Sequence, residues 1–367
     1  MNSLDKNVAL QPEPGTDAVT GAPGRDAIAK ALDALYQGRQ PRTFENANPW
    51  SRGGEDPLDA ISVWQRAEPV PHWHYVSYGL SDLYAKKSAS SASGFGFELT
   101  LRAAVEPGAT EPPLWPMHLL QSLARYVYRT GHGFHDGHRM SANGPISLAA
   151  PTELRSMAFT FDPELSTIAT PNGSVAFLQV VGITVDEEAV AQRWDTGKLL
   201  ATLLPFMPLY CTDLARASLL GQPGVMAKVT EGIHADGSSS SAVHTDLLKI
   251  REQQRWLRKS HITITLGARQ IEQLAELIPL RLPFGKTFQL VGPRGRMLFE
   301  PGKKNRWSIG RDGVLRLQVA AATVTEFATL LHPREGVYKL PSFQHILWDV
   351  KPTTIRNAEG GIVDVIG

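Results

Sequence analysis

The pattern of apolar and polar positions predicts a mixture of strands and helices. Between Phe95 and Arg102 apolar and polar residues alternate strictly, which predicts a strand with one face buried and the other exposed. Segment 175–185, VAFLQVVGITV, is apolar almost throughout and follows a PNGS turn signal. Such a run is typical of a central strand that is covered on both faces.

Two segments near the N-terminus predict amphipathic helices. Residues 27–38 follow a candidate N-cap at Asp26, carry apolar residues on one face and end in a glycine. Segment 112–133, PPLWPMHLLQSLARYVYRTGHG, has an apolar stripe at helical spacing and Gly131 after it. The stripe consists of Leu119, Leu120, Leu123 and Val127. We expect this second helix to be the most regular one in the chain.

The remaining pattern adds elements of both kinds. Residues 186–206 predict a helical stretch that is interrupted around Gly197. Farther along, 261–267 and 306–319 predict strands, and 268–278 predicts a short helix. Strands and helices do not alternate regularly in either half, so we expect an α+β fold rather than a doubly wound sheet.

A change in composition predicts two domains. Segment 231–248, EGIHADGSSSSAVHTDLL, contains a glycine and four consecutive serines, which predict a flexible spacer rather than part of a core. We place the junction near residue 240, between an N-terminal domain of residues 26–240 and a smaller C-terminal domain of residues 241–367. Residues 1–25, rich in Pro, Gly and Thr, predict a flexible tail. The expected fold is therefore two mixed α/β domains joined by a Ser/Gly-rich hinge.

Composition narrows the class of protein without identifying it. Of the 367 residues, 42% are hydrophobic and 20% are charged, which is ordinary for a globular protein, and the formal charge of +1 provides no global field for nucleic acid or a membrane. The single cysteine, Cys211, cannot form an intramolecular disulfide. No leader and no apolar run of membrane-spanning length is visible in the sequence. These features predict a cytoplasmic protein.

Histidines form the first group with candidate chemistry. His72 and His74 are two residues apart, so on a strand they would share one face, as a zinc site requires. A second group lies in a Gly-rich loop and consists of His132, His135, Asp136 and His138. Together the groups could serve a metal-dependent hydrolase. The interpretation we favour for His72 and His74 is a semi-buried aromatic surface, built with Trp73 and the neighbouring tyrosines.

Other catalytic signatures are missing from the sequence. It contains no GxSxG elbow, no phosphate-binding loop and no GxGxxG, and Cys211 lies in an apolar setting, PFMPLYCTDL. We therefore expect no enzyme, no cofactor and no metal. Segment 292–313 carries six basic residues beside Trp307: Arg294, Arg296, Lys303, Lys304, Arg306 and Arg311. This segment could contact phosphates, but we favour a solvated loop and expect no nucleic-acid partner.

Several segments, taken together and in order, resemble one known family. They are DPLDAISVW, HWHYVSYGLSDLY, SGFGFELTLR, PPLWPMHLLQSLARYV, PNGSVAFLQVVGIT and EGIHADGSS. Over roughly residues 55–245 these segments are similar to the N-terminal domain of the Suppressor of fused family. The C-terminal part is similar through HITITLGARQIEQLAELIPLRL and YKLPSFQHILWDV.

The resemblance implies a regulatory, non-catalytic protein. Animal members bind Gli zinc-finger transcription factors, and a partner peptide adds as a strand in the cleft between their two domains. Carried over, this implies partner-binding roles for Tyr126, Val243 and Thr245. His138 stands where the family has an acidic residue that pairs with a histidine of the Gli motif Ser-Tyr-Gly-His-Leu. Asp136 is two residues away and could replace it only if the loop is displaced.

Three hypotheses about function follow. The chain lacks the long polar insertion of animal members, and this compact form resembles bacterial members that are suspected of neutralising toxins as immunity proteins. The leading hypothesis is therefore a protein that binds a partner segment, either from a toxin or resembling a transcription factor. The second is a Gli-type repressor, and the third is the histidine-rich, metal-dependent hydrolase.

Overall fold

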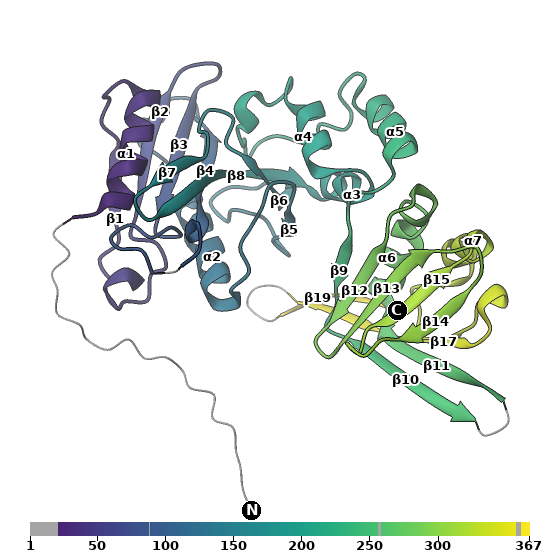
Figure 1. Cartoon of the computed structure of the whole chain (residues 1–367). Coiled ribbons are helices and arrows are strands. Elements are labelled where there is room, and N and C mark those ends of the chain that lie inside the picture. Colours follow the sequence, from purple (N-terminus) through teal and green to yellow (C-terminus); the bar gives the residue numbers. More distant parts are fainter. Residues whose placement is uncertain (1–20, 88, 256–257, 357–360) are drawn as a thin grey trace, which may run out of the picture.

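The structure, a computed structural model, describes residues 21–87, 89–255, 258–356 and 361–367. These residues form two domains that are connected by a single segment of chain near residue 240 (Figure 1). Most of the predicted N-terminal tail, residues 1–20, lies outside the described residues. The mixed α/β composition of both domains confirms the predicted fold class.

The N-terminal domain is built on one eight-stranded sheet with the order β1-β2-β3-β4-β8-β6-β5, to which β7 is added beside β8. Its strands are β1 (Arg42–Glu45), β2 (Ala60–Arg66), β3 (His72–Tyr78), β4 (Ala92–Ala104), β5 (Arg139–Ser141), β6 (Leu154–Phe161), β7 (Ile168–Thr170) and β8 (Gly173–Thr184). Strands β4 and β8 pair in parallel at the centre, where both predicted strands are found. The remaining neighbours are antiparallel.

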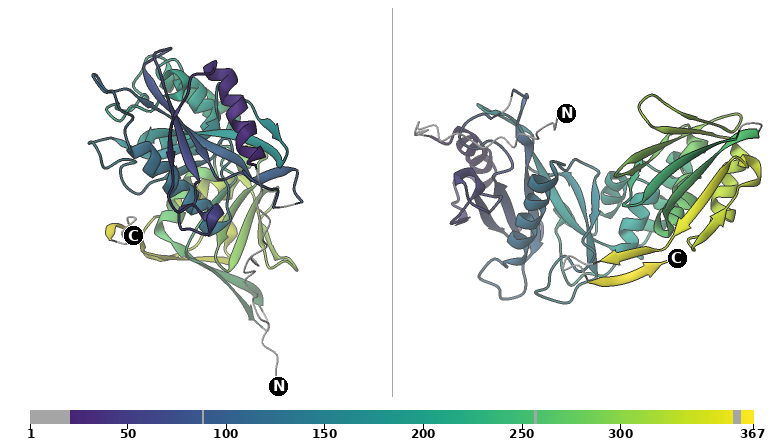
Figure 2. Two further views of the ribbon diagram at one scale, coloured as in Figure 1. Left: turned by 90° about the vertical axis from the view of Figure 1, so that its left-hand side faces the viewer. Right: turned by 90° about the horizontal axis from the view of Figure 1, so that it is seen from below.

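Helices cover both faces of this sheet (Figures 1 and 2). They are α1 (Pro23–Tyr36), α2 (Trp115–Thr130), α3 (Val185–Arg193), α4 (Thr196–Leu203) and α5 (Val225–Asp236), with short 3-10 turns η1 (Trp50–Arg52) and η2 (Pro208–Tyr210). Helix α1 packs on the face that carries Trp64 and Val76. Helix α2 packs on the opposite face, against Tyr75 and Leu101. Alternate residues of one strand therefore serve two separate cores.

The predicted helix boundaries are close to those observed. Helix α2 ends before Gly131, whose φ of 71° and bond to the Val127 carbonyl make it the expected C-cap. Helix α1 begins earlier than predicted, at Pro23, so Asp26 lies in its first turn and is not the N-cap. The interruption near Gly197 falls at Trp194, and Asp195 caps α4 by accepting a hydrogen bond from the Lys198 N–H at 2.9 Å.

The C-terminal domain contains two larger sheets and one hairpin. The first sheet has the order β10-β11-β17-β16, the second β14-β15-β13-β12-β9, and β18 pairs with β19 as a two-stranded sheet. The strands are β9 (Ala242–His244), β10 (Leu248–Arg255), β11 (Arg258–Gly267), β12 (Phe288–Gly292), β13 (Gly295–Pro301), β14 (Arg306–Ile309), β15 (Leu315–Val319), β16 (Gly336–Tyr338), β17 (Ile346–Lys351), β18 (Thr353–Arg356) and β19 (Ile362–Ile366).

The core of this domain is separate from those of the N-terminal domain. Helices α6 (Ala268–Leu277) and α7 (Ala321–Leu330) pack with the two sheets, accompanied by the turns η3 (Leu282–Phe284) and η4 (Pro341–Phe343). The buried hydrophobic residues that form this core all lie between Val243 and Val350. We therefore propose a domain boundary near residue 240. The β18–β19 hairpin points toward the N-terminal domain in Figures 1 and 2.

The serine-rich segment joins the domains as predicted, but it is not the flexible spacer we expected. Ser238 and Ser240 are buried, and both hydroxyls donate to the carbonyl of Gln192 at the end of α3, at 2.6 and 2.9 Å. From the other domain, Arg281 donates to the Ser238 carbonyl at 2.8 Å. Serine can satisfy backbone groups at close range, so a run that resembles a linker can also be a bonded joint.

Candidate partner-binding edges

The first candidate edge is β5, the last strand of the N-terminal sheet on the side nearest the C-terminal domain (Figure 1). On its inner side the Phe159 N–H donates to the His138 carbonyl and the Ala142 N–H donates to the Arg155 carbonyl, both at 2.9 Å. Main-chain groups of a strand point alternately to its two sides. Those of Arg139 and Ser141 therefore point away from β6, where none of the described strands pairs with them.

The second candidate edge is β9, the terminal strand of the C-terminal domain's five-stranded sheet. The Ser241 carbonyl accepts from the Gln289 N–H and the Thr245 N–H donates to the Val291 carbonyl, both at 2.9 Å. By the same alternation, the main-chain N–H and C=O groups of Val243 point toward β12 and pair with it. The N–H and C=O groups of Ala242 and His244 face the open side.

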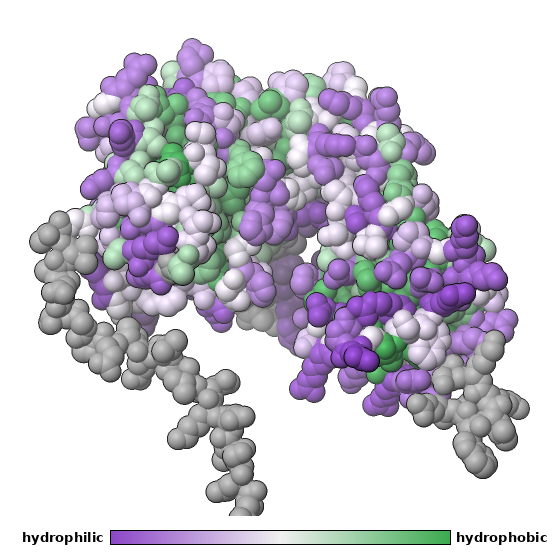
Figure 3. Space-filling model, viewed as in Figure 1, coloured by the Kyte–Doolittle hydropathy of each residue, from purple (hydrophilic) through white to green (hydrophobic). Residues whose placement is uncertain are grey.

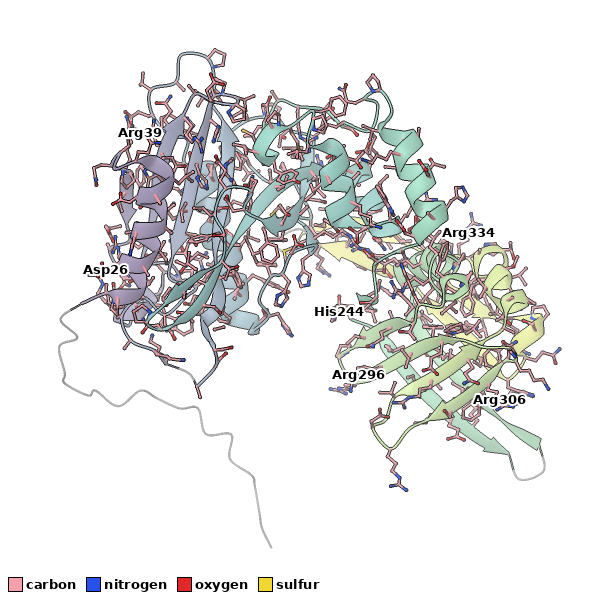
Figure 4. The ribbon with its side chains drawn as sticks, turned by 45° about the horizontal axis from the view of Figure 1, so that its top comes forward. Asp26, Arg39, His244, Arg296, Arg306 and Arg334 are labelled. Carbon is pink, nitrogen blue, oxygen red and sulfur yellow. The ribbon has the colours of Figure 1, made fainter. Side chains whose placement is uncertain are left out.

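The two edges belong to facing parts of the two domains. Arg139 on β5 lies within electrostatic reach of Glu276 on α6, and Arg193 forms an ion pair with the same Glu276 at 3.4 Å. Figure 3 shows a hollow between the domains, and Figure 4 places His244 and Arg296 on the side of the C-terminal domain that borders it. Both side chains are exposed.

Tyr126 lies on α2 with 39% of its surface exposed. Its ring stacks on Phe134 at 5.7 Å between centroids, and Phe134 stacks on Phe159 at 4.0 Å. The stack connects an exposed tyrosine to the sheet beside β5. Tyr126 therefore offers a supported aromatic surface, while it remains a predicted rather than a demonstrated contact residue.

His138 is exposed in the loop that leads into β5, and its ring meets that of His135 edge-on at 5.1 Å. Partial burial, together with the neighbouring charges of His135 and Arg139, lowers the pKa of His138. Asp136 accepts a hydrogen bond from the Phe161 N–H at 3.2 Å. Its carboxylate is thus bonded within the N-terminal domain, and its replacement of the family's acidic residue stays a prediction.

Val243 and Thr245 are less accessible than the resemblance implies. Only 8% of Val243 and 7% of Thr245 is exposed, and Val243 belongs to the core of the C-terminal domain. Their side chains position β9 and do not offer a surface. The residues that the sequence did not single out, Ala242 and His244, carry the open main-chain groups, and no side-chain pattern distinguishes such positions.

His72 and His74 are structural, and both are completely buried rather than semi-buried. The His72 ring bonds to the Val70 carbonyl at 2.7 Å. His74 lies between the Tyr36 hydroxyl, 2.6 Å from its Nδ1, and a carboxylate oxygen of Asp162, 3.2 Å from its Nε2. An ionised carboxylate can only accept, so the tautomer that suits Asp162 carries its proton on Nε2 and leaves Nδ1 to accept from the Tyr36 hydroxyl.

A buried polar network surrounds His74. Arg102, with no exposed surface, donates two hydrogen bonds to Asp162 at 2.7 and 3.0 Å and one to Glu164 at 2.9 Å. Burial and the positive charge of Arg102 lower the pKa of His74 to about 4. The imidazole is therefore neutral at physiological pH, as a packing role requires.

The metal-site hypothesis finds no support in the geometry. His74 is bonded inside the N-terminal core, whereas His132, His135 and His138 lie in the loop after α2. Among the residues that the structure describes, no three His, Cys, Asp or Glu side chains come together as a metal site. Burial raises the pKa of the Cys211 thiol to about 12, which opposes formation of a nucleophilic thiolate.

The basic residues of segment 292–313 are distributed along strands and turns of the C-terminal domain. Arg296 lies on β13 near the hollow, whereas Arg306 begins β14 well away from it (Figure 4). These two arginines therefore lie on different parts of the domain. The expectation of a solvated segment without a nucleic-acid partner stays a prediction.

Comparison with known proteins assigns the family. The family model of the Suppressor of fused protein (SUFU) matches residues 54–217. The human Suppressor of fused homolog is 37% identical over 209 residues, which cover 52% of this chain, and the mouse homolog matches equally well. The chain belongs to the Suppressor of fused family. The match spans only 43% of the length of these curated relatives.

Solved structures extend the comparison to the fold. The crystal structure of Drosophila Suppressor of Fused matches 92% of this chain and 99% of its own, with a TM-score of 0.76 and 21% identity. A chain from a crystal structure of the Sufu–Fu complex matches 57% of this chain and 98% of its own, with a TM-score of 0.54 and 30% identity. The two-domain Suppressor of fused fold is therefore confirmed.

Suppressor of fused proteins are regulatory rather than enzymatic, which agrees with the predicted class. None of the helices in the described part of the chain is both long and apolar enough to cross a membrane.

Proposed function

We propose that this protein regulates a protein partner by binding an extended segment of it between β5 and β9. The proposal rests on one observation: the facing domains each end in a strand whose outer main-chain groups pair with no other strand in the described part of the chain. A segment inserted between two such edges extends both sheets at once. The match to a chain of the Sufu–Fu complex supports a protein as the partner.

The available hydrogen bonds set the scale of the affinity. Arg139, Ser141, Ala242 and His244 each offer one N–H and one C=O, which makes four times two, or eight, groups. At about 1 kcal/mol net per bond, strand addition yields about 8 kcal/mol before the cost of ordering the segment, about 1–2 kcal/mol per residue. Side-chain contacts must therefore supply much of the affinity and all of the specificity.

The side chains beside the edges favour an acidic segment. His138 and Arg139 border β5, while His244 and Arg296 lie on the facing side of the other domain. A carboxylate opposite His138 would gain a charge-assisted hydrogen bond. A histidine at that position, as in Ser-Tyr-Gly-His-Leu, would not. We therefore propose a partner other than a Gli protein, and the resemblance to compact bacterial members makes a toxin the class to test first.

Selection of peptides on the full chain tests this proposal. We would select random dodecapeptides from a displayed library and measure the affinity of synthetic copies by fluorescence anisotropy. We expect the selected peptides to carry an acidic residue flanked by strand-forming residues. Tyr126→Ala should weaken their binding at least about ten-fold. Tyr338→Ala, which removes a half-buried tyrosine of β16, is the matched control and should leave binding unchanged.

A second variant tests the strand edge directly. Ala242→Pro removes an N–H that faces the open side of β9 and leaves the bonds to β12 in place, so peptide binding should fall while thermal unfolding changes little. The idea is abandoned if the selected peptides bind the wild type, Tyr126→Ala and Ala242→Pro equally well.

A further inference from the structure

A cavity of about 260 Å³ lies in the N-terminal domain, away from the two edges. Its wall is formed by η1, the loop that follows β3, the start of β4 and the last turn of α2. Four aromatic residues and two carboxylates line this wall: Trp50, Tyr84, Phe95, Tyr128, Asp59 and Asp82. Neither the proposed function nor the family assignment uses this cavity.

Three of these aromatic residues form a connected surface. Tyr128 meets Trp50 edge-on at 4.2 Å between ring centroids and meets Phe95 edge-on at 5.0 Å. The Tyr128 hydroxyl donates to the Gly79 carbonyl, which fixes the orientation of the ring. Trp50 keeps 49% of its surface exposed, an unusual exposure for a tryptophan that already has an aromatic partner. Its remaining surface is available to a ligand.

Carboxylates give the cavity a negative field. Asp59, only 2% exposed, accepts hydrogen bonds from the Ser51 and Tyr84 hydroxyls at 2.7 and 2.8 Å. Asp82, 8% exposed, accepts from the Lys87 N–H at 3.0 Å. Within the described residues, neither carboxylate has a Lys, Arg or His in ion-pair contact. Their donors are neutral, so their charge is left without a counter-ion.

A third acidic group lies directly behind the cavity wall. Glu98 is completely buried and accepts five hydrogen bonds, all from hydroxyls and main-chain N–H groups of Ser77, Gly79, Leu80 and Ser81. Burial raises its pKa, and the hydrogen bonds from Ser77, Ser81 and Gly79 act in the opposite direction. Burial and then the charges of Glu98, Asp59 and Asp82 raise the pKa of Tyr128, so all three groups act on the same wall.

The nearby basic groups are exposed or already paired. Lys87 borders the cavity, but its side chain is exposed. Arg25 and Arg52 lie within electrostatic reach of Tyr84; Arg25 is paired with Glu45, and Arg52 is exposed. Aromatic faces attract cations through their quadrupoles, and buried carboxylates attract them through charge. The aromatic residues and the carboxylates of the wall therefore both favour a positively charged ligand.

We infer that this cavity binds an organic cation, an alkylammonium group held against Trp50 and Tyr128 and stabilised by Asp59 and Asp82. The group can come from a free small amine or from a lysine side chain, methylated or not, of a protein. Within the described residues, no group of three or more His, Cys, Asp or Glu side chains that could hold a metal ion occurs.

Calorimetric titration of the full chain with choline tests the inference, with 3,3-dimethylbutan-1-ol as the uncharged control of the same shape. We expect millimolar binding of choline and binding about ten-fold weaker for the alcohol. Trp50→Leu, which keeps an apolar surface but removes the aromatic face, should reduce the preference by weakening choline more than the alcohol. Trp307→Leu, at a half-buried tryptophan of β14, should preserve it.

Asp59→Asn removes the negative charge but preserves the hydrogen bonds that support the fold, because an amide oxygen can still accept from Ser51 and Tyr84. It should weaken choline and leave the alcohol unchanged, with an unaltered melting temperature. Titration with a peptide that contains trimethyl-lysine distinguishes the two sources: tighter binding than choline points to a protein, and equal or weaker binding points to a free amine. Equal affinity for choline and the alcohol, or no binding of either, overturns the inference.

Discussion

The buried imidazole of His74 makes the stability of the N-terminal domain depend on pH in a predictable way. Its pKa is about 4 in the folded protein, against about 6.5 for an ordinary histidine. The unfolded chain therefore binds more protons between these values. The stabilisation is fully present above about pH 6.5 and is lost as the pH falls toward 4. From pH 7.5 to pH 4.5 the two pKa values imply a loss of about 2.5 kcal/mol.

Urea unfolding followed by tryptophan fluorescence measures this loss. His74→Gln keeps a donor for Asp162 and an acceptor for Tyr36 but does not titrate, so its stability should fall by about 2.5 kcal/mol less than that of the wild type over this pH range. His118→Gln, at an exposed histidine of α2, is the matched control and should follow the wild type. Parallel curves for His74→Gln and the wild type would refute the reasoning, since the protein would then show no cost of protonating His74.

Three further substitutions test separate parts of the fold. Arg102→Met leaves the buried Asp162 without its bidentate cation and should cost about 3–5 kcal/mol in urea unfolding. Gly237→Ala should loosen the joint, because the φ of 63° disfavours alanine and the added carbon would overlap the Phe284 ring; faster proteolysis between the domains is the expected readout. Thr184→Ala removes half of the capping box of α3 and should cost about 1 kcal/mol, measured as a lower melting temperature.

Regular elements were predictable because their causes are local. The stripe and terminal glycine of α2 and the alternation in β4 are visible in the sequence, and both elements lie within a few residues of the predicted positions. The alternation in β4 did not reveal that a second core covers the polar face of this strand. Thr100 and Arg102 were expected on an exposed face, yet both are completely buried, because α1 and the loop that carries Asp162 cover that face.

The candidate sites were harder to predict, since they depend on contacts between distant segments. Tyr126 was named through the family resemblance of the segment LARYV, because it lies outside the apolar stripe of α2. The open edges are properties of the main chain, and Ala242 and Ser141 have no side-chain chemistry that would mark them. The aromatic cavity joins Trp50 to Tyr128 across 78 positions of sequence, a pairing that no local pattern reveals.

Because the joint between the domains is hydrogen-bonded, the number of residues in the connecting segment determines which residues of β9 face the core. Ser240 is fixed to Gln192 of one domain, and β9 begins two residues later in the sheet of the other. One inserted residue between them would reverse the alternation of β9, turning Val243 out of the core and exchanging the main-chain groups on the open side. In homologous chains that keep this architecture, the residue types between α5 and β9 should therefore vary far more readily than the length of this segment.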